Sequence, residues 1–245
     1  MNSSETTYQE YFENRKPSAL GQKLWFIFNQ RLWMHAQKII QLKPNSQINE
    51  IGVGHGHFLE RVRQQGHKTF GIDINRAVIE KMRTLGFEGE CAEAPPLPLN
   101  TPQADLFWLS HLIEHVGDCT KARQLLSEIR GKLVPGGYIV IIAPDILSWK
   151  QEFWNVDWSH QFPTSPYRME QLLHETGFEI LRCGTQTCTV INPILAFILD
   201  LVHKLIPYNL LDHLLFRPLF KRRLAYSWMG VFGWRQIFMI GKKTN

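Results

Sequence analysis

One pentapeptide brings together three groups that can exchange protons or bind metals. His111-Leu112-Ile113-Glu114-His115 places two imidazoles four residues apart, with a carboxylate beside the second. On a helix this spacing puts both imidazoles on one face, as in the zinc motif of some peptidases. The pentapeptide, however, directly follows the buried strand-like run ADLFWLS, and no second block of zinc ligands is recognisable downstream. We therefore do not expect a peptidase.

The same groups suit proton transfer. Because imidazole titrates near neutrality, His111, Glu114 or His115 could take the proton of a hydroxyl acceptor. The alternative is structural: Glu114 and His115 would then only form hydrogen bonds across the junction between a strand and a helix.

A second candidate cluster is WKQEFWNVDWSH, from Trp149 to His160, which has three tryptophans and one histidine in twelve positions. It follows an apolar strand, and in an open sheet such a loop overhangs the ligand. Aromatic walls with one polar group suit an acceptor pocket, so we expect His160 to act on the substrate side. The alternative is that these aromatic side chains anchor the loop in the core.

A glycine-rich loop follows the first strand, in the run INEIGVGHG. Gly52, Gly54 and Gly56 let the backbone approach a ligand at the carboxyl end of the strand. Asp73 ends the next strand, where a carboxylate can accept both hydroxyls of a ribose. The dinucleotide fingerprint needs its third glycine where His57 stands, so an NAD-dependent oxidoreductase is the less favoured alternative.

The elements that hold these residues alternate along the chain. After a leading helix over 17–42, the patterns predict helices over 57–65, 76–85, 119–133 and 167–175, and strands over 47–53, 67–73, 104–110, 137–144, 178–184 and 234–243. Such alternation favours an α/β fold with a doubly wound, mostly parallel sheet. The last strand follows an apolar segment and could rejoin the same sheet.

Five blocks carry a family resemblance: INEIGVGHGHFLERV, HKTFGIDIN, ECAEAPPLPL, ADLFWLSHLIEHV and LVPGGYIVIIAPD. In this order and spacing they resemble class I S-adenosylmethionine-dependent methyltransferases of the small-molecule type, a group that includes ubiquinone-biosynthesis O-methyltransferases and cyclopropane fatty acid synthases. The resemblance covers about residues 45–185. It implies a Rossmann-like seven-stranded sheet with helices on both faces, and S-adenosyl-L-methionine as cofactor.

The resemblance also assigns residues. Those implied for the cofactor are Glu50, Gly52 and Gly54 at the methionine part, Asp73 and Ile74 at the ribose, Glu93 and Ala94 at the adenine, and Ser110 near the sulfonium. Those implied for the acceptor side are His111, Glu114, His115 and His160. In some relatives the acidic-histidine pair holds a divalent metal, but His111 replaces the carboxylate that those relatives carry. We therefore expect no metal.

Charge is distributed unevenly. The formal net charge is +5, yet from Leu201 onward eight basic residues face one acidic residue, so the first 200 residues are mildly acidic. A nucleic-acid enzyme usually spreads basic surface over its catalytic domain, so we expect no nucleic-acid partner. The four cysteines have no paired spacing, and the chain opens without an apolar signal segment, which together favour the cytoplasm.

We divide the chain into a helical lid (1–44), a cofactor-binding domain (45–189), a helical insertion (190–230) and a final strand with a basic tail (231–245). The insertion combines apolar helical runs with basic residues, so it could touch an anionic membrane surface. The alternative is a helical cap over the sheet. The expected function is methyl transfer to oxygen of a small-molecule, sugar or lipid-linked acceptor. A non-catalytic membrane-docking adaptor is the remaining alternative, and the oligomeric state is not predicted.

Overall fold

The computed structural model describes residues 19–187, 198, 201–202, 205–220 and 234–244. Its centre is a seven-stranded sheet with the strand order β3-β2-β1-β4-β5-β7-β6. The strands are β1 Gln47–Ile51, β2 Lys68–Asp73, β3 Glu88–Cys91, β4 Ala104–Ser110, β5 Leu133–Pro144, β6 Phe178–Thr187 and β7 Arg235–Lys243. The first five pair in parallel, and β7 lies antiparallel between β5 and β6.

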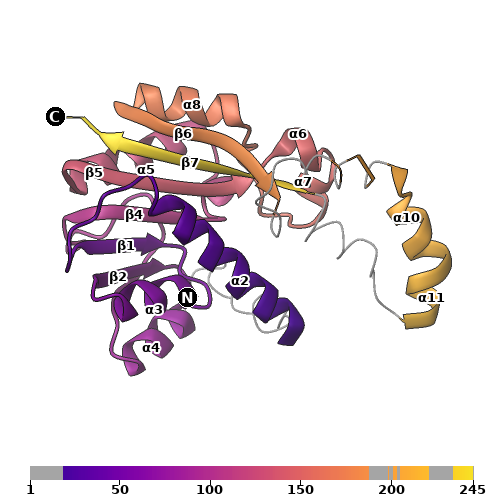
Figure 1. The fold of residues 1–245 in the computed structure, drawn as a ribbon, viewed down its shortest axis with the longest axis horizontal. Helices are drawn as coiled ribbons and strands as arrows, with labels where there is room; N and C mark the ends of the chain where they lie inside the picture. The colour runs from indigo at the N-terminus through magenta and orange to yellow at the C-terminus, as the bar shows by residue number, and fades with distance from the viewer. Residues whose placement is uncertain (1–18, 188–197, 199–200, 203–204, 221–233, 245) are drawn as a thin grey trace.

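Helices cover both faces of this sheet, as Figure 1 shows. The helices of the described residues are α2 Ala19–Ala36, α3 His57–Gln64, α4 Arg76–Thr84, α5 Cys119–Lys132, α6 Ile146–Trp149, α7 Glu152–Asn155, α8 Pro166–Glu175, α10 Tyr208–Leu211 and α11 Arg217–Phe220, with the short 3-10 turn η1 Ile113–His115 and the π-helical segment η2 Asp212–Phe216. Helices α5 and α8 pack on one face, and α2, α3 and α4 pack on the other. The predicted α/β class with helices on both faces is confirmed.

The two-sided core follows from the period of the strands. In β4, Leu106 and Trp108 belong to the layer under α2 and α3, while Phe107 and Leu109 belong to the layer under α5. Successive side chains of a strand point to opposite faces, so a strand buried on both faces must be apolar at every position. This explains the uninterrupted apolar run LFWL over 106–109.

Local signals fix where the helices begin. The side chain of Asn75 accepts a hydrogen bond from the N–H of Ala77 at the start of α4, and Asp118 caps α5 in the same way. Such caps satisfy N–H groups that the first helical turn leaves without a partner. They hold the strand-to-helix turns, and therefore the loops at the carboxyl edge of the sheet, in fixed conformations.

The predicted elements agree with the structure to within a few residues at most ends. The one described strand that the pattern missed is β3, whose sequence is the polar tetrapeptide EGEC. An edge strand this short and polar has no apolar alternation to reveal it. The late strand β7 does rejoin the sheet, as expected.

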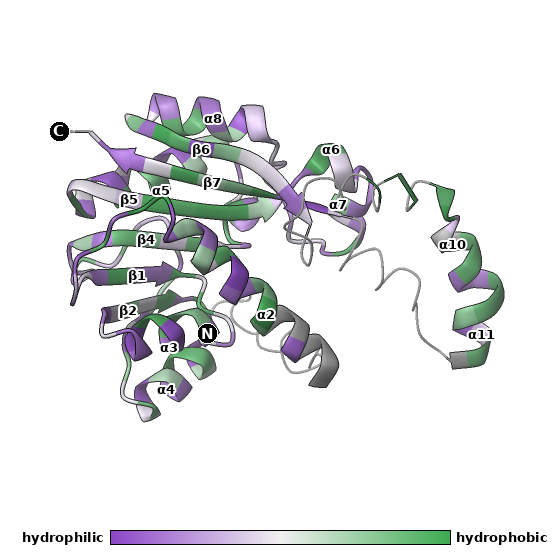
Figure 2. Cartoon of the chain, in the orientation of Figure 1, coloured by the Kyte–Doolittle hydropathy of each residue, from purple (hydrophilic) through white to green (hydrophobic). Residues whose placement is uncertain are grey.

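Much of the predicted insertion over 190–230 lies outside the described residues. Its described helices, α10, η2 and α11, extend away from the sheet (Figure 1) and contain hydrophobic residues interspersed with hydrophilic ones (Figure 2). Leu210, Leu214, Leu215 and Leu219 are about half exposed or more. No described helix is both long and apolar enough to cross a membrane.

Trp108 anchors the layer above the carboxyl end of the sheet. Its fully buried ring stacks on Phe58 at a centroid distance of 4.2 Å and meets Trp33 edge-on at 5.9 Å. Helices α2 and α3 thus pack against β4 through one aromatic cluster.

We predict that Trp108→Ala lowers the free energy of unfolding by about 3–5 kcal/mol, because it leaves a large cavity in this cluster. Urea denaturation measures the change. Trp158→Ala is the matched control, since that side chain is 70% exposed, and it should shift stability by about 0.5 kcal/mol or less. Equal shifts in the two variants would contradict the assigned role.

Candidate functional site

The glycine loop is a left-handed turn between β1 and α3. Gly52, Gly54 and Gly56 have φ values of 79°, 56° and 78°, a conformation that side chains disfavour. At Gly52 a Cβ would also come within 3.2 Å of the Leu112 side chain. Glycine is therefore required here by backbone conformation, and the turn leaves the end of β1 open to a ligand.

Asp73, at the end of β2, ties this loop to the next one. Its carboxylate accepts hydrogen bonds from the N–H of Gly54 at 3.0 Å and from the N–H of Asn75 at 2.8 Å. Burial raises the pKa of Asp73, and these backbone donors oppose the rise because they favour the ionised form. The carboxylate is thus fixed in place at the cavity wall.

Glu50, in β1, is almost fully buried, and its Oε2 has no hydrogen-bond partner. Burial, and then the nearby charge of Asp73, raise its pKa well above the ordinary value. Burying a carboxyl oxygen without a hydrogen-bond partner costs free energy unless a ligand binds to that oxygen. A cationic or hydrogen-bond-donating ligand group would do so.

Both sets of predicted residues line one cavity of about 740 Å³. The predicted cofactor residues on its wall are Glu50, Gly52, Gly54, Asp73, Ile74, Glu93, Ala94 and Ser110, and the predicted acceptor-side residues are His111, Glu114, His115 and His160. Glu93 is exposed at the rim, and Ser110 ends β4. The structure brings all twelve together, and their individual roles stay predictions.

The pentapeptide after β4 forms a tight turn, η1, instead of an α-helix. His111 has a φ of 54°, and its Nδ1 lies 3.2 Å from Oε1 of Glu114. Glu114 is fully buried. Burial by itself would raise the pKa of Glu114, but the hydrogen bond with His111 and the imidazoles of His115 and His160 outweigh it, so the pKa is lowered.

Two further histidine contacts complete the acceptor side. Nδ1 of His115 lies 2.9 Å from Oγ of Ser159, and that hydroxyl donates to Asp157 at 2.6 Å. His160 is buried and bonds through Nδ1 to the carbonyl oxygen of Phe153. Burial lowers the pKa of His160, which favours the neutral ring.

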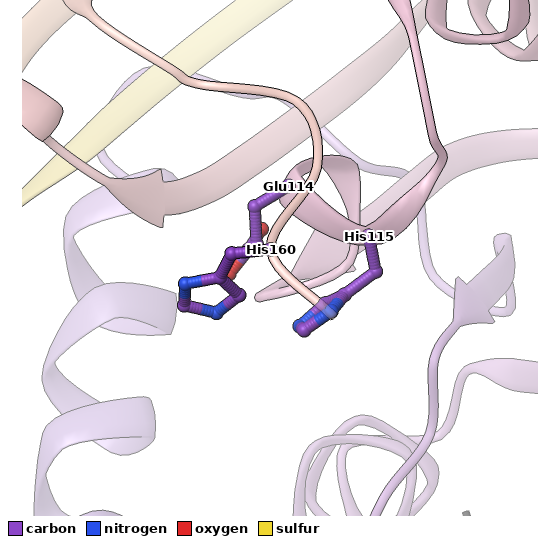
Figure 3. Close-up of side chains that lie close together, drawn as sticks. All are labelled: Glu114, His115 and His160. Carbon is purple, nitrogen blue, oxygen red and sulfur yellow. The ribbon is translucent and has the colours of Figure 1, made fainter. Parts of the chain in front are cut away.

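Glu114, His115 and His160 form a compact cluster (Figure 3). Each offers one ligand atom, and the three atoms lie within 4.8 Å of one another. His160 comes from a different segment, and backbone hydrogen bonds hold that segment in place: the N–H groups of Gln161 and Phe162 donate to the carbonyl oxygen of Glu114 at 2.9 and 3.0 Å. The arrangement can bind and deprotonate a polar acceptor group, or hold a cation.

The aromatic loop is partly wall and partly core. Trp149 lines the cavity, packs on Trp234 with ring centroids 4.7 Å apart, and donates from Nε1 to the carbonyl oxygen of Arg235. Trp158 also lines the cavity, although it is largely exposed, and Trp154 is exposed and does not line it. Trp149 therefore anchors the loop in the core, and the use of the loop as an acceptor pocket stays a prediction.

Sequence reasoning missed several residues of the cavity. Asn29 of α2 and Trp234 before β7 reach it from distant parts of the chain, and no local pattern marks them. Ser159 and Asp157 did carry a signal: the Asp-x-Ser spacing is typical of a turn in which Asp accepts from the backbone two residues on, and the N–H of Ser159 donates to Asp157 at 2.9 Å.

Comparison with known families identifies the central part of the chain. Residues 49–141 match the family model of a methyltransferase domain. This segment contains the glycine loop, Asp73 and the pentapeptide at the end of β4. No curated protein matched in the sequence search.

Solved structures share the fold. A SAM-dependent methyltransferase from Archaeoglobus fulgidus is 24% identical, with 89% of this chain and 93% of that chain covered and a TM-score of 0.59. NodS, an N-methyltransferase from Bradyrhizobium japonicum WM9 in complex with S-adenosyl-L-homocysteine, is 12% identical, with both chains fully covered and a TM-score of 0.62. The cyclase SpnF is 16% identical, with 87% and 80% covered and a TM-score of 0.59.

We predict that Glu50→Gln stabilises the ligand-free protein at pH 8. An acid whose pKa is raised by folding holds a proton that the unfolded chain has lost, so stability falls as pH rises through the interval between the two pKa values. The amide removes that cost, which we expect to raise the free energy of unfolding by about 1–3 kcal/mol.

Thermal unfolding at pH 5.5 and pH 8 tests this effect, and the gain should be larger at pH 8. Glu60→Gln is the matched control, because Glu60 is exposed on α3. A gain at pH 5.5 equal to that at pH 8 would refute the electrostatic explanation.

Proposed function

We propose that this chain, a class I S-adenosylmethionine-dependent methyltransferase, transfers the methyl group to an oxygen atom of its acceptor. The observation that carries the proposal is that one cavity is lined by two groups of polar residues. One group is the pair of buried carboxyl groups of Glu50 and Asp73, and the other is the cluster of Glu114, His115 and His160.

The group of Glu50 and Asp73 suits the cofactor. S-adenosylmethionine carries an ammonium group, a ribose diol and a positively charged sulfonium, and it supplies a methyl group to a nucleophile by in-line displacement. The unsatisfied oxygen of Glu50 suits the ammonium, and Asp73 suits the diol. A Cβ at Gly54 would meet no atom within 4 Å, so there is open space beside the glycine loop at that residue.

The cluster of Glu114, His115 and His160 suits an acceptor that must lose a proton. A hydroxyl becomes a good nucleophile as its O–H bond breaks, and a positioned base lowers that barrier. His115 and His160 lie at the cavity wall beside Glu114. The remaining contribution is alignment of donor and acceptor with exclusion of water, for which the loop with Trp149 and Trp158 provides the wall.

The oxygen assignment rests on this cluster and not on the fold. The structural neighbours include an N-methyltransferase and a cyclase, and one fold hosts many reactions. Because a neutral amine already has a lone pair, it needs no base before attack. A fixed carboxylate with two imidazoles therefore favours a hydroxyl.

We predict that S-adenosylhomocysteine binds the protein and that Asp73→Ala weakens its binding by about 10–100-fold, since a charge-assisted hydrogen bond contributes about 1.5–3 kcal/mol. Calorimetry measures the affinity, and Glu60→Gln is the control.

Methyl-labelled S-adenosylmethionine incubated with fractionated cell extract identifies the product. His115→Ala should lower kcat at least about 100-fold and leave S-adenosylhomocysteine binding within about threefold.

Other results would favour the alternatives. A thermal shift with NADH and none with S-adenosylhomocysteine would support an oxidoreductase. Binding of S-adenosylhomocysteine with a label on nitrogen or carbon would overturn the oxygen assignment. Membrane docking without any methyl transfer would support a non-catalytic adaptor.

We propose further that the acceptor is lipid-linked and is met at a membrane surface. The support is the segment α10–η2–α11, which exposes Leu210, Leu214, Leu215 and Leu219. Basic residues Lys221, Arg222 and Arg223 follow it directly in the sequence. Apolar area and attraction to anionic lipid act together in interfacial helices.

We predict that the protein co-sediments with vesicles containing anionic phosphatidylglycerol and less with pure phosphatidylcholine. The triple change Leu214→Glu, Leu215→Glu and Leu219→Glu should weaken vesicle binding at least about tenfold, because burying each leucine contributes about 1.5–3 kcal/mol. Leu99→Glu is the matched control, since Leu99 is 98% exposed outside this segment. A dimer in solution that the triple change dissociates, without vesicle binding, would contradict the proposal.

A further inference from the structure

The cluster of Glu114, His115 and His160 has features that proton transfer alone does not require. Its three side chains come from two segments of the chain: Glu114 and His115 follow β4, and His160 lies in the loop before α8. Figure 3 shows the three side chains gathered at one point. The hydrogen bonds around these side chains indicate which nitrogen and oxygen atoms can coordinate a cation.

The ring of His160 is held in a defined tautomer. A carbonyl oxygen can only accept, so the bond to the carbonyl oxygen of Phe153 requires a proton on Nδ1. In the neutral ring the lone pair is then on Nε2. Ligating histidines are usually oriented in this way, by donating their other nitrogen to a carbonyl or carboxylate.

His115 is oriented by a similar chain. The hydroxyl of Ser159 donates to the carboxylate of Asp157, so its oxygen accepts from Nδ1 of His115. This again leaves the lone pair of the neutral ring on Nε2. Asp157 therefore acts on His115 through Ser159, as an outer carboxylate acts on a metal-bound imidazole.

Glu114 supplies a carboxylate oxygen that the protein leaves unsatisfied. Oε1 bonds to His111, whereas Oε2 is buried without a hydrogen-bond partner. The side chain is fully buried, so water at the surface does not compensate this oxygen. An orphaned buried carboxylate oxygen beside two oriented imidazoles calls for a positively charged or hydrogen-bond-donating group.

We propose that Glu114, His115 and His160 form a binding site for a divalent transition-metal ion such as Zn²⁺. Two imidazoles and one carboxylate are the ligand set of catalytic zinc sites that keep an open position, and imidazole disfavours Mg²⁺ and Ca²⁺. Ligand atoms that lie within 4.8 Å need to approach to about 3.4 Å for tetrahedral bonds of about 2.1 Å.

This site differs from the one that the sequence resemblance suggested. There, His111 stands in place of a carboxylate ligand, which predicts no metal. In the structure the ring of His111 contacts Glu114, and His160 is the third group that could bind a cation. His111 and Ser159 are therefore positioning residues in this proposal.

The metal site extends the proposed methyl transfer, and its catalytic role rests on that proposed function. With a cation bound, the acceptor hydroxyl would take the open position, and its pKa would fall. The O–H bond then breaks with loss of the proton to water, the new C–O bond forms, and the S–C bond of the donor breaks. In this scheme the bound cation replaces a free imidazole in assisting loss of the proton: His115 and His160 act as ligands instead of as bases, and the oxygen acceptor stays the same.

The test uses the full chain without a histidine tag, stripped with a chelator and titrated with Zn²⁺ by calorimetry. We expect one Zn²⁺ per chain. Glu114→Gln and His160→Gln should each weaken binding by at least about 100-fold, and Ser159→Ala by about 10–100-fold, as outer-shell changes do. His174→Gln is the matched control, because His174 is exposed on α8. Replacement by Co²⁺ should give a visible absorption band that His160→Gln abolishes.

S-adenosylhomocysteine binding by each variant reports whether the protein is folded, and it separates the two proposals. Zn²⁺ affinity that is equal in the parent, His160→Gln and His174→Gln proteins would overturn the metal site, as would the absence of any Zn²⁺ binding. Zn²⁺ binding without S-adenosylhomocysteine binding would contradict the proposed function and leave the metal site intact.

Discussion

The parallel pairing of β1 with both β2 and β4 is the constraint on which the site depends. Parallel neighbours end at the same edge of a sheet, so Glu50, Asp73 and Ser110 meet there although 60 residues of sequence separate the first from the last. The pairing is possible because these strands are largely apolar and are covered by helices on both sides. Their buried polar side chains need partners: Asn49, in the middle of β1, donates to the carbonyl oxygen of Pro102, and Asp73, at the end of β2, accepts from the backbone N–H groups of the following turns.

The acceptor side depends on a second constraint, the attachment of the loop after α7. Two backbone hydrogen bonds to the carbonyl oxygen of Glu114 hold the strand-to-helix turn and this loop together. They bring His160 next to His115, with ring centroids 4.8 Å apart. Because the backbone itself makes the connection, the cluster does not rely on flexible side chains for its geometry, which is what a pre-organised site requires.

The sequence predicts the first constraint far better than the second. Apolar runs, glycine turns and helix caps are local, and they locate β1, β2 and β4 together with Asp73 at a strand end. The cluster is non-local: neither the approach of His160 to Glu114 nor the orientation of His115 through Ser159 can be read from spacing. The polar edge strand β3 and the contributions of Asn29 and Trp234 were missed for related reasons, since their positions follow from tertiary packing.

The two buried glutamates of the cavity, Glu50 and Glu114, also differ in their electrostatic surroundings. Burial and the neighbouring carboxylate of Asp73 raise the pKa of Glu50, whereas hydrogen bonding to His111 and the nearby imidazoles overcome burial and lower the pKa of Glu114. Two carboxyl groups with similar burial thus have pKa values shifted in opposite directions because their neighbours differ in charge. A positively charged ligand group would stabilise the ionised form of Glu50, so cofactor binding and the ionisation of Glu50 are coupled.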